Sequence, residues 1–386
     1  MGDKRQPHIP GIDGLRCYAM ISVLALHLGL FPIGWAGVWF FFVISGFVIT
    51  GTLIGRLDKE TAASAELYRF YARRFRRIVP AYLLIIFISK LVPHYVTDAN
   101  LFPALPYFLT FTFNIASSLD NSMMANTRLE HLWSISAEQQ FYIFFPACMI
   151  YLSREKFKNF LLLIVVLSPI FRLALASYLS FTGWDDASAG KVVYLFPVGH
   201  FDGFAVGALI AMLYHSGGLT RTHARRLWQG GFAASFVYLA VYLLLARMQF
   251  GVWSGKNLVT MPLLGQGREA FIYSIVVCFS AACLTSLLTG SGIGLTITAP
   301  PPVRYIGKIS YGCYLFHGLA IYMAATWFPD LFGKGIYGHA VLFLPVLIAT
   351  IALAALSFHL FENPIMRGGW RRAFPLPKKE VADPGT

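Results

Sequence analysis

The sequence predicts an all-helical, polytopic membrane protein with about ten transmembrane helices. Apolar residues make up 57% of the 386 residues and charged residues only 13%, whereas soluble chains are roughly a quarter charged. The mean hydropathy is correspondingly high, at +0.62. Apolar stretches of about 20 residues, the length that crosses a bilayer, recur along the chain, and basic residues gather in alternate connections between them. An aromatic content of 16% also excludes disordered and coiled-coil chains.

The apolar stretches define the expected domain. The polar start, Met1 to Arg16, could belong to a signal peptide, but no small-residue cleavage site follows and further spans come at once. We therefore expect a cytoplasmic amino-terminal segment (1–13), a transmembrane domain (14–361) and a basic cytoplasmic tail (362–386). The expected spans lie at about 14–31, 35–54, 79–97, 133–152, 159–179, 193–214, 228–246, 269–289, 306–327 and 339–361.

One further apolar segment, residues 101–118, leaves the topology open at this stage. It carries Pro103 and Pro106, which disfavour a regular lipid-facing helix. Irregular backbone is tolerated at membrane depth only where protein or a water-filled cavity surrounds it. The segment is therefore either an eleventh crossing or a short re-entrant element, and charge decides between the two.

The distribution of basic residues favours the re-entrant alternative. If the segment does not cross and both termini are cytoplasmic, the cytoplasmic segments hold 23 of the 31 Lys and Arg residues and the outer loops hold seven. Arg172, which lies inside a span, completes the count. A full crossing would instead move the basic residues of 154–158 and 221–226 outside. We therefore expect both ends of the chain to be cytoplasmic.

The same distribution excludes nucleic acid as a partner, although the formal net charge is +13. The basic residues are scattered beside the membrane over six cytoplasmic segments, as membrane insertion requires. We expect no metal site and no disulfide, because the cysteines lie in apolar stretches without framework spacing. They are Cys17, Cys148, Cys278, Cys283 and Cys313.

Polar residues at membrane depth are the best candidates for function, because each is costly unless it is paired or solvated. Arg16 and His27 are eleven residues apart, so they project from one helix face at positions roughly 16 Å apart along the axis. Histidine is the natural proton carrier near neutral pH. The alternative is an interfacial arginine and a histidine paired within the bundle.

The densest basic run, Arg73-Arg74-Phe75-Arg76-Arg77, lies just before Pro80. Arg74 and Arg77 share a helix face at i, i+3. Guanidinium groups bind phosphate oxygens bidentately, so a cytoplasmic arginine cluster suits a phosphate-bearing ligand. Topology determination and contact with lipid headgroups would explain the charge equally well.

Two more segments place polar residues along one helix stripe. In the first, His131, Ser134 and Glu138 fall at i, i+3 and i+7, and an ionisable residue as deep as Glu138 indicates function. In the second, Tyr314 and His317 follow Ser310 at i+4 and i+7. Hydrogen bonds between helices are the structural alternative for both. Lesser candidates are His200, Asp202, His359 and Glu362, and Arg172 needs a partner that the sequence does not name.

Together these segments resemble the integral-membrane acyltransferase family three. The resemblance runs from Ile12 to about Pro364, with six pieces in the family's order. They are Ile12-Asp-Gly-Leu-Arg16 with His27, Gly37 to Phe47, Arg73 to Pro80, His131 to Tyr142, Ser310 to His317, and Phe361-Glu-Asn-Pro364.

The resemblance implies a multi-pass enzyme of the bacterial inner membrane with ten core spans. Such an enzyme moves an acyl group, often acetyl, from cytoplasmic acyl-CoA to a hydroxyl of a carbohydrate such as an exopolysaccharide or O-antigen. It implies catalytic roles for Arg16, His27, Glu138 and His317. It also ties Arg74 and Arg77, flanked by Arg73 and Arg76, to the acyl donor.

We expect the acceptor near Trp133, Ser136, Tyr314 and Asp202. The implied partners are acyl-CoA as co-substrate, a carbohydrate acceptor, the lipid bilayer and glycan-synthesis machinery, with no bound cofactor. One departure is Trp39, where many members have an acidic residue. Two other functions stay open. A transporter could use the same buried polar residues as a substrate path, although no internal repeat is visible, and a non-catalytic membrane scaffold would need none of them.

Overall fold

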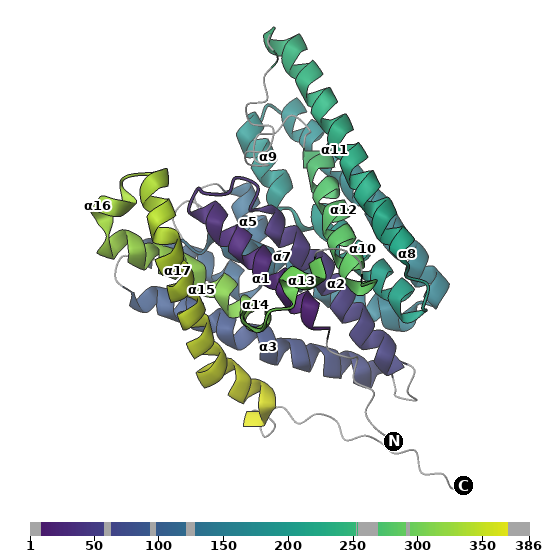
Figure 1. Ribbon diagram of the computed structural model, residues 1–386, viewed down its shortest axis with the longest axis horizontal. Helices are drawn as coiled ribbons and strands as arrows, with labels where there is room; N and C mark the ends of the chain where they lie inside the picture. Colours follow the sequence, from purple (N-terminus) through teal and green to yellow (C-terminus); the bar gives the residue numbers. More distant parts are fainter. Residues whose placement is uncertain are drawn as a thin grey trace.

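The computed structural model describes residues 9–57, 63–92, 98–120, 128–251, 253, 269–290 and 294–369. Within these ranges the protein is all-helical, with sixteen α-helices and no strand, which confirms the all-helical part of the predicted fold class. The ribbon in Figure 1 shows the long helices gathered in one bundle, with the start of α1 and the end of α17 on the same side. All five cysteines are unpaired.

Four helices carry the predicted catalytic and donor-binding residues. They are α1 (Pro10–His27), α3 (Ala63–Leu91), α7 (Trp133–Tyr151) and α15 (Ser310–Trp327). Helix α1 begins with a proline, whose missing N–H costs nothing in a first turn, and it has Asp13 there. Its last residue is His27. An acid in the first turn and a base in the last turn both match the helix dipole.

Six further helices complete the bundle around these four. They are α2 (Ala36–Leu57), α8 (Arg154–Phe181), α10 (Phe201–His215), α11 (Arg221–Phe250), α12 (Glu269–Leu288) and α17 (Ile336–Ser357). In Figure 1, α11 lies beside α12 along most of its length, and the two helices are in contact. Thr220 and His223 form a capping box that begins α11, and Gly251, at φ +70°, ends it.

Six helical segments are long and apolar enough to cross a membrane, which is fewer than the ten that the sequence predicts. They are Ala36–Arg56, Arg154–Phe181, Pro197–His215, Arg221–Met248, Phe271–Leu288 and Ile336–Arg367. The polar side chains of α1, α3, α7 and α15 lower their hydropathy, so these helices are not among the six. The helices that carry the candidate site are thus the least apolar ones, and the other helices shield them.

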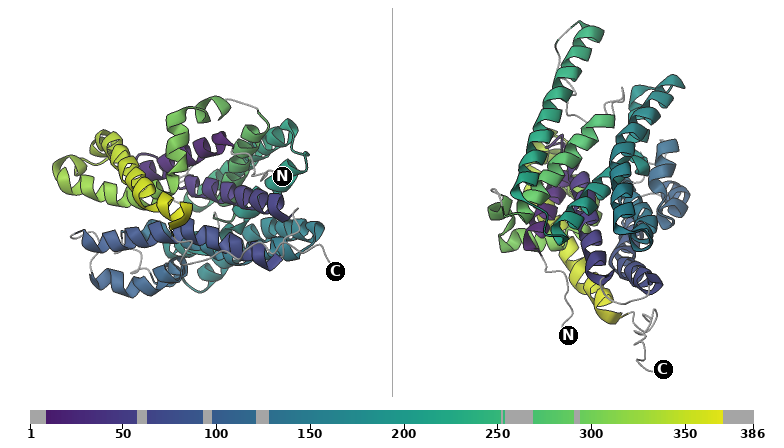
Figure 2. Two further views of the ribbon diagram at one scale, coloured as in Figure 1. Left: turned by 90° about the horizontal axis from the view of Figure 1, so that it is seen from below. Right: turned by 90° about the vertical axis from the view of Figure 1, so that its right-hand side faces the viewer.

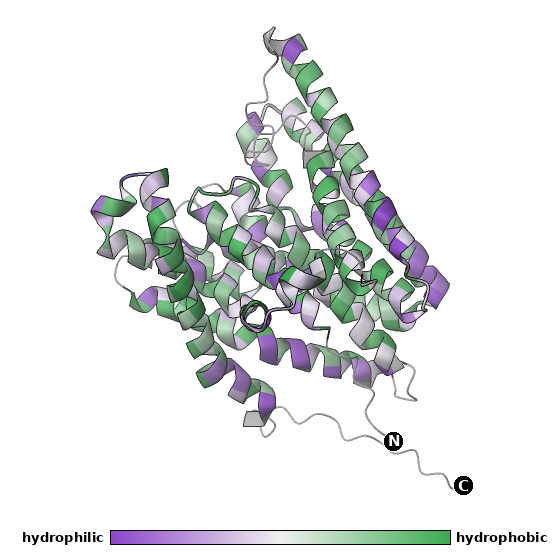
Figure 3. Cartoon of the chain, viewed as in Figure 1, coloured by the Kyte–Doolittle hydropathy of each residue, from purple (hydrophilic) through white to green (hydrophobic). Residues whose placement is uncertain are grey.

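Helix α3 lies across the bundle instead of alongside its neighbours. Figure 1 shows it crossing the direction of α11 and α12 on the side of the bundle where α1 starts and α17 ends, and Figure 2 shows it from below. In Figure 3, hydrophilic residues gather on α3, on the amino-terminal part of α11 and at the end of α17. That side is the one that the charge pattern predicts to be cytoplasmic.

The ambiguous segment 101–118 forms two short helices, α4 (Asp98–Leu109) and α5 (Phe113–Leu119). The longer one rises only about 18 Å, against a hydrocarbon core of about 30 Å, so neither spans it alone. Phe111 between them has a φ of +54°. The amide of Gln140 donates to the Phe111 carbonyl at 2.7 Å and to Oδ1 of Asn114 at 2.9 Å, so protein groups satisfy the broken backbone. This geometry fits the re-entrant alternative.

Two glycines let α2 and α10 approach each other closely. A Cβ atom added at Gly46 would lie 2.0 Å from the Phe204 carbonyl oxygen, and one added at Gly207 would lie 2.0 Å from the Val43 carbonyl oxygen. No real Cβ atom tolerates such a distance. The two backbones therefore touch directly, as small residues allow in membrane helices.

Short elements connect and end the bundle, and the last two are π-helical. Glu362, expected to open the tail, is instead 5% exposed within the first of these two. The short elements are η1 (Glu130–Leu132), α9 (Asp186–Leu195), η2 (Pro197–His200), α13 (Gly294–Thr298), α14 (Pro301–Lys308), α16 (Pro329–Phe332), η4 (Phe358–Glu362) and η5 (Ile365–Gly369). The rest of the predicted tail and residues 1–8 lie outside the described residues.

Candidate active site

Three histidines from separate parts of the chain meet at one end of the site. His27 ends α1, His131 lies in η1, and His317 lies in the middle of α15. The ring centroids of His27 and His317 are 5.0 Å apart, and those of His131 and His317 are 4.6 Å apart. His131 and His317 are buried, whereas His27 is exposed. His27 is therefore the member of this histidine cluster that a substrate can reach.

Hydroxyl and backbone groups hold the two buried histidines. Nδ1 of His317 lies 2.7 Å from the Tyr314 carbonyl oxygen. Because a carbonyl only accepts hydrogen bonds, a neutral His317 carries its proton on Nδ1 and presents Nε2 as the basic nitrogen. The Tyr314 hydroxyl donates to the His131 carbonyl at 2.9 Å and lies 2.6 Å from Oγ of Ser134. Nε2 of His131 is buried without a hydrogen-bond partner.

A second cluster of charged groups lies at the other end of α1. Nη1 of Arg16 is 3.2 Å from Oδ1 of Asp13. Arg77 interacts electrostatically with Arg16, Arg74 and Glu138. Arg16 on α1 therefore lies beside Arg74 and Arg77 on α3, and we call these residues the arginine cluster. No pattern in the sequence indicated that the two helices meet here.

Glu138 is bound by two hydroxyl groups and faces the arginines. Ser45 Oγ donates to Oε1 of Glu138 at 2.7 Å, and the Tyr142 hydroxyl donates to the same oxygen. The Arg74 guanidinium lies 5.0 Å from the centroid of the Tyr142 ring, within the range of a cation–π contact. Sequence reasoning gave no role to Ser45 or Tyr142. For Tyr142, the i, i+4 spacing from Glu138 was an available signal.

The carboxylates of the arginine cluster balance its arginines. Glu362 interacts electrostatically with Arg77, and its Oε1 accepts a hydrogen bond from Ser357 at 2.8 Å. Tyr311, which also interacts with Glu362 and Glu138, donates to the Ile78 carbonyl at 2.8 Å. With Glu362 the cluster contains three arginines and three carboxylates: Arg16, Arg74, Arg77, Asp13, Glu138 and Glu362.

Helices α1, α7 and α15 connect the two clusters. Arg16 and His27 on α1 are eleven residues apart, and so are Tyr142 on α7 and His131 in η1, the short helix that leads into α7. Eleven residues of helix rise about 16 Å. Ser134 and Tyr314 lie between the clusters. The arginine and histidine clusters therefore lie about 16 Å apart along a line of polar side chains inside an apolar bundle.

Arg73 and Arg76 lie outside the arginine cluster. Arg73 interacts with Arg74 of that cluster, but also with Arg56 near the end of α2 and with Glu66 and Arg69 nearer the start of α3. Nε of Arg76 donates to the Ala72 carbonyl of its own helix at 3.0 Å. The four arginines of the basic run thus face different surroundings, because successive helix positions are turned by about 100°.

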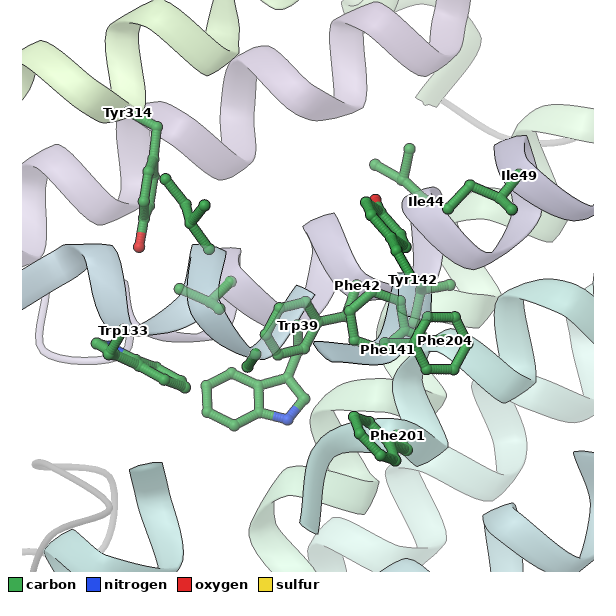
Figure 4. Close-up of a cluster of buried hydrophobic side chains, with 14 of the residues drawn as sticks. Trp39, Phe42, Ile44, Ile49, Trp133, Phe141, Tyr142, Phe201, Phe204 and Tyr314 are labelled. Carbon is green, nitrogen blue, oxygen red and sulfur yellow. The ribbon is translucent and has the colours of Figure 1, made fainter. Parts of the chain in front are cut away.

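An aromatic wall extends along α7 from the histidine end. Trp133 packs against Tyr194 and Trp39, with centroids 4.6 and 6.5 Å away. Figure 4 shows the wall passing Trp39 and Phe42 towards Phe204. Trp39 is fully buried and stacks on Tyr273, with ring centroids 4.6 Å apart. In this protein that position therefore belongs to the core.

The structure does not bring the other two predicted substrate residues to the histidine cluster. Oγ of Ser136 lies 3.4 Å from the Leu132 carbonyl of its own helix, and Ser136 is fully buried. Oδ2 of Asp202 forms a buried ion pair with Nη1 of Arg172 at 2.9 Å, and Ser274 lies 2.6 Å from the same guanidinium. Asp202 is thus the partner of Arg172 that the sequence could not name. Both residues stay predictions as substrate contacts.

Among the described residues, no group of three or more His, Cys, Asp or Glu side chains has the arrangement of a metal site.

A model of the acyltransferase domain matches residues 9–359, which is most of the chain. The chain belongs to the acyltransferase 3 family. This finding confirms the family resemblance of the sequence motifs.

Curated relatives of the chain are O-acetyltransferases. The chain is 25% identical to the O-acetyltransferase OatA of Staphylococcus aureus over 390 residues, which cover 97% of this chain and 60% of the relative. It is 28% identical to the peptidoglycan O-acetyltransferase OatA of Listeria monocytogenes over 384 residues, covering 95% of this chain and 57% of the relative. The chain thus spans about three fifths of the length of these relatives. No solved structure matches it.

Proposed function

We propose that this protein is an O-acyltransferase embedded in the bacterial inner membrane. It transfers an acyl group, most commonly acetyl in this family, from cytoplasmic acyl-CoA to a carbohydrate hydroxyl that arrives from the other side. Family membership and the names of the relatives support the reaction class. The arrangement of the two polar clusters supports the route across the membrane.

The separation of the two clusters carries the proposal. An extended backbone advances about 1.2 Å per bond, since each residue contributes three bonds and at most 3.6 Å. About thirteen bonds join the sulfur of coenzyme A to the nearer phosphorus of its diphosphate. At about 1.2 Å per bond, the extended pantetheine arm reaches about 16 Å. That length equals the rise of α1 between Arg16 and His27. A diphosphate held at the arginine cluster would place its thioester at the histidine cluster.

The arginine cluster suits the phosphate end of the donor. Arg74 and Arg77 present guanidinium forks, which bind phosphate oxygens bidentately. Glu138 and Glu362 offset the arginine charges while the site is empty, which makes three neighbouring guanidinium groups tolerable inside the bundle. A docked diphosphate would compete with these carboxylates for the same guanidinium groups.

The histidine cluster supplies the base for the transfer. His27 takes the proton of the acceptor hydroxyl while the hydroxyl oxygen bonds to the thioester carbonyl carbon. The carbon–sulfur bond then breaks, and the thiolate leaves towards the cytoplasm. His317 touches the His27 ring and acts as a positioning residue. Ser134 and Tyr314 lie between the two clusters and border the path of the thioester. Contact of Tyr314 or Trp133 with the acceptor stays a prediction.

The acceptor is a carbohydrate hydroxyl in this proposal, and its glycan is open to direct assay. The name of the Listeria relative assigns peptidoglycan to that protein. Exopolysaccharide and O-antigen are further candidates for this chain. An enzyme of this kind would act beside the machinery that assembles or exports the glycan.

Transfer from labelled acetyl-CoA tests the proposed function. The full chain in nanodiscs is incubated with labelled acetyl-CoA and peptidoglycan fragments, O-antigen or exopolysaccharide, and alkali-labile label on the glycan is counted. We expect the wild type to label one of these glycans. We expect His27→Ala to lower the rate by about 100- to 10,000-fold, because general-base help has that magnitude. His215→Ala, at an exposed histidine on α10, is the matched control.

Two results would contradict the proposal. Equal labelling by wild type and His27→Ala would show that His27 is not the general base. Label that stays unmodified but crosses the membrane of proteoliposomes in a His27-dependent manner would indicate a transporter instead. A scaffold would show neither labelling nor transport.

A further inference from the structure

A second group of arginines lies at the cytoplasmic end of the bundle, apart from the arginine cluster. Arg56 is near the end of α2, and Glu66, Arg69 and Arg73 follow one another at i, i+3 and i+7 on α3. Nη1 of Arg69 lies 2.7 Å from Oε1 of Glu66, and Nη1 of Arg56 lies 3.9 Å from Oε2. Arg73 interacts electrostatically with all three. We call these four residues the rim cluster.

The rim cluster has an excess of positive charge. It combines three arginines with one carboxylate, whereas the arginine cluster contains three arginines and three carboxylates. Glu66 is only 4% exposed, so it is held between the guanidinium groups and is not open to solvent. The Arg56 side chain is 39% exposed, which leaves the cluster open to a ligand from the cytoplasm.

A hydrogen-bond donor without a partner also indicates a binding site for an anion. Nη2 of Arg73 is buried and has no hydrogen-bond partner. A buried guanidinium N–H without an acceptor is unfavourable, so such groups are nearly always paired in folded proteins. The missing partner of this donor, beside a net charge of about two, has the properties of a dianion with several acceptor oxygens. A phosphate monoester has both.

We propose that Arg56, Arg69 and Arg73 form a binding site for a phosphate monoester. The assignment of the ligand rests on the proposed function: this site binds the 3′-phosphate of the coenzyme A nucleotide, and the arginine cluster binds the diphosphate. Arg73 and Arg77 are one turn apart on α3, a rise of about 6 Å. A ribose that carries phosphates on O3′ and O5′ spans a similar distance. The headgroup of phosphatidic acid presents the same chemistry and is the second possible source.

Removing the 3′-phosphate from the donor tests the site. Initial rates of acetyl transfer are measured in phosphatidylcholine nanodiscs with acetyl-CoA and with acetyl-3′-dephospho-CoA, for wild type, Arg73→Gln and Arg69→Gln. We expect the wild type to prefer acetyl-CoA by about tenfold in kcat/KM, a typical value for one charge-assisted hydrogen bond. The preference should fall to about twofold or less in either variant. Arg225→Gln, at an exposed arginine of α11, should keep it.

Binding provides a readout that does not depend on transfer. Adenosine 3′,5′-bisphosphate should raise the thermal midpoint of the wild type more than adenosine 5′-monophosphate does, and Arg73→Gln should abolish the difference. If the wild type transfers acetyl but shows neither the donor preference nor this difference, the nucleotide site is wrong and the proposed function stands. If no transfer occurs but the difference is present, the site stands and the proposed function fails.

A lipid arm separates the two phosphate sources. The donor comparison is repeated in nanodiscs that contain phosphatidic acid. A lipid ligand predicts that phosphatidic acid stabilises the wild type but not Arg73→Gln, with no preference between the two donors. If neither the nucleotide nor the lipid distinguishes wild type from Arg73→Gln, the rim cluster binds no phosphate monoester.

Discussion

At Glu138, two hydroxyl groups converge on one carboxylate oxygen, and they come from α2 and from the next turn of α7. This arrangement fixes the carboxylate, so it faces Arg77 instead of rotating freely. Hydrogen bonds of this kind are stronger inside an apolar bundle than in water. The position of the Arg77 guanidinium therefore depends on groups from two other helices: Ser45 on α2, and Glu138 and Tyr142 on α7.

Substitution of Arg77 tests the donor side of the site. We expect Arg77→Gln to raise the KM for acetyl-CoA by about tenfold or more, because it removes a charge-assisted contact to the diphosphate. The KM for the acceptor should change little. Steady-state rates at varied donor and acceptor concentrations measure both constants. Arg226→Gln, at an exposed arginine of α11, is the charge-matched control. An unchanged donor KM would indicate that Arg77 serves only topology.

At the scale of helices, α2 organises the bundle. Its Ser45 donates a hydrogen bond to Glu138. Its aromatic residues pack against Trp133 and His200, and its backbone contacts that of α10. The reciprocal contact between Gly46 and Gly207 sets the distance between α2 and α10. Because Ser45 precedes Gly46, a change in that distance would also move the hydroxyl that holds Glu138.

Adding one methyl group at Gly46 tests this packing. The new Cβ of Gly46→Ala would lie 2.0 Å from the Phe204 carbonyl oxygen, so the two backbones must separate. We expect a loss of stability of about 1–3 kcal/mol, the usual cost of overpacking, and reduced transferase activity. Gly55→Ala on the same helix meets nothing within 4 Å and should be neutral. Thermal unfolding in detergent compares them, and equal midpoints would contradict the close contact.

Across the whole molecule, the polar residues form a path that the apolar helices enclose. The rim cluster, the arginine cluster and the histidine cluster follow one another from the side on which α1 starts. Helices α8 and α11, whose apolar segments are the least buried inside the protein, lie outside this path and expose apolar surface suited to lipid. This order fits a donor that enters from the side predicted to be cytoplasmic.

Labelling of introduced cysteines tests that orientation. Ser216→Cys lies in the connection after α10, predicted to be cytoplasmic, and Ala187→Cys lies in the first turn of α9, predicted to be outside; both positions are exposed. In intact cells, a membrane-impermeant maleimide should label Ala187→Cys only. Both should react in lysed cells. The wild type, with five cysteines that are buried or half-buried, controls for background. The opposite pattern in intact cells would invert the proposed topology.

The sequence by itself determined the fold class, the family and most of the candidate residues. Composition and apolar length are properties of the chain, and motifs such as Arg16 with His27 are local enough to read directly. Local periodicity also showed that His131 and Glu138 share a stripe, and that Tyr314 and His317 share another.

Only the tertiary structure decided which of these residues meet. It joined His27, His131 and His317 in one cluster, paired Asp202 with Arg172, and separated Arg73 from Arg77. It also showed fewer strongly apolar helices than expected and a broken helix in the ambiguous segment. The physical reason is that contacts such as Ser45 with Glu138 join residues far apart in the chain. Their proximity depends on how whole helices pack, and no local pattern specifies that packing.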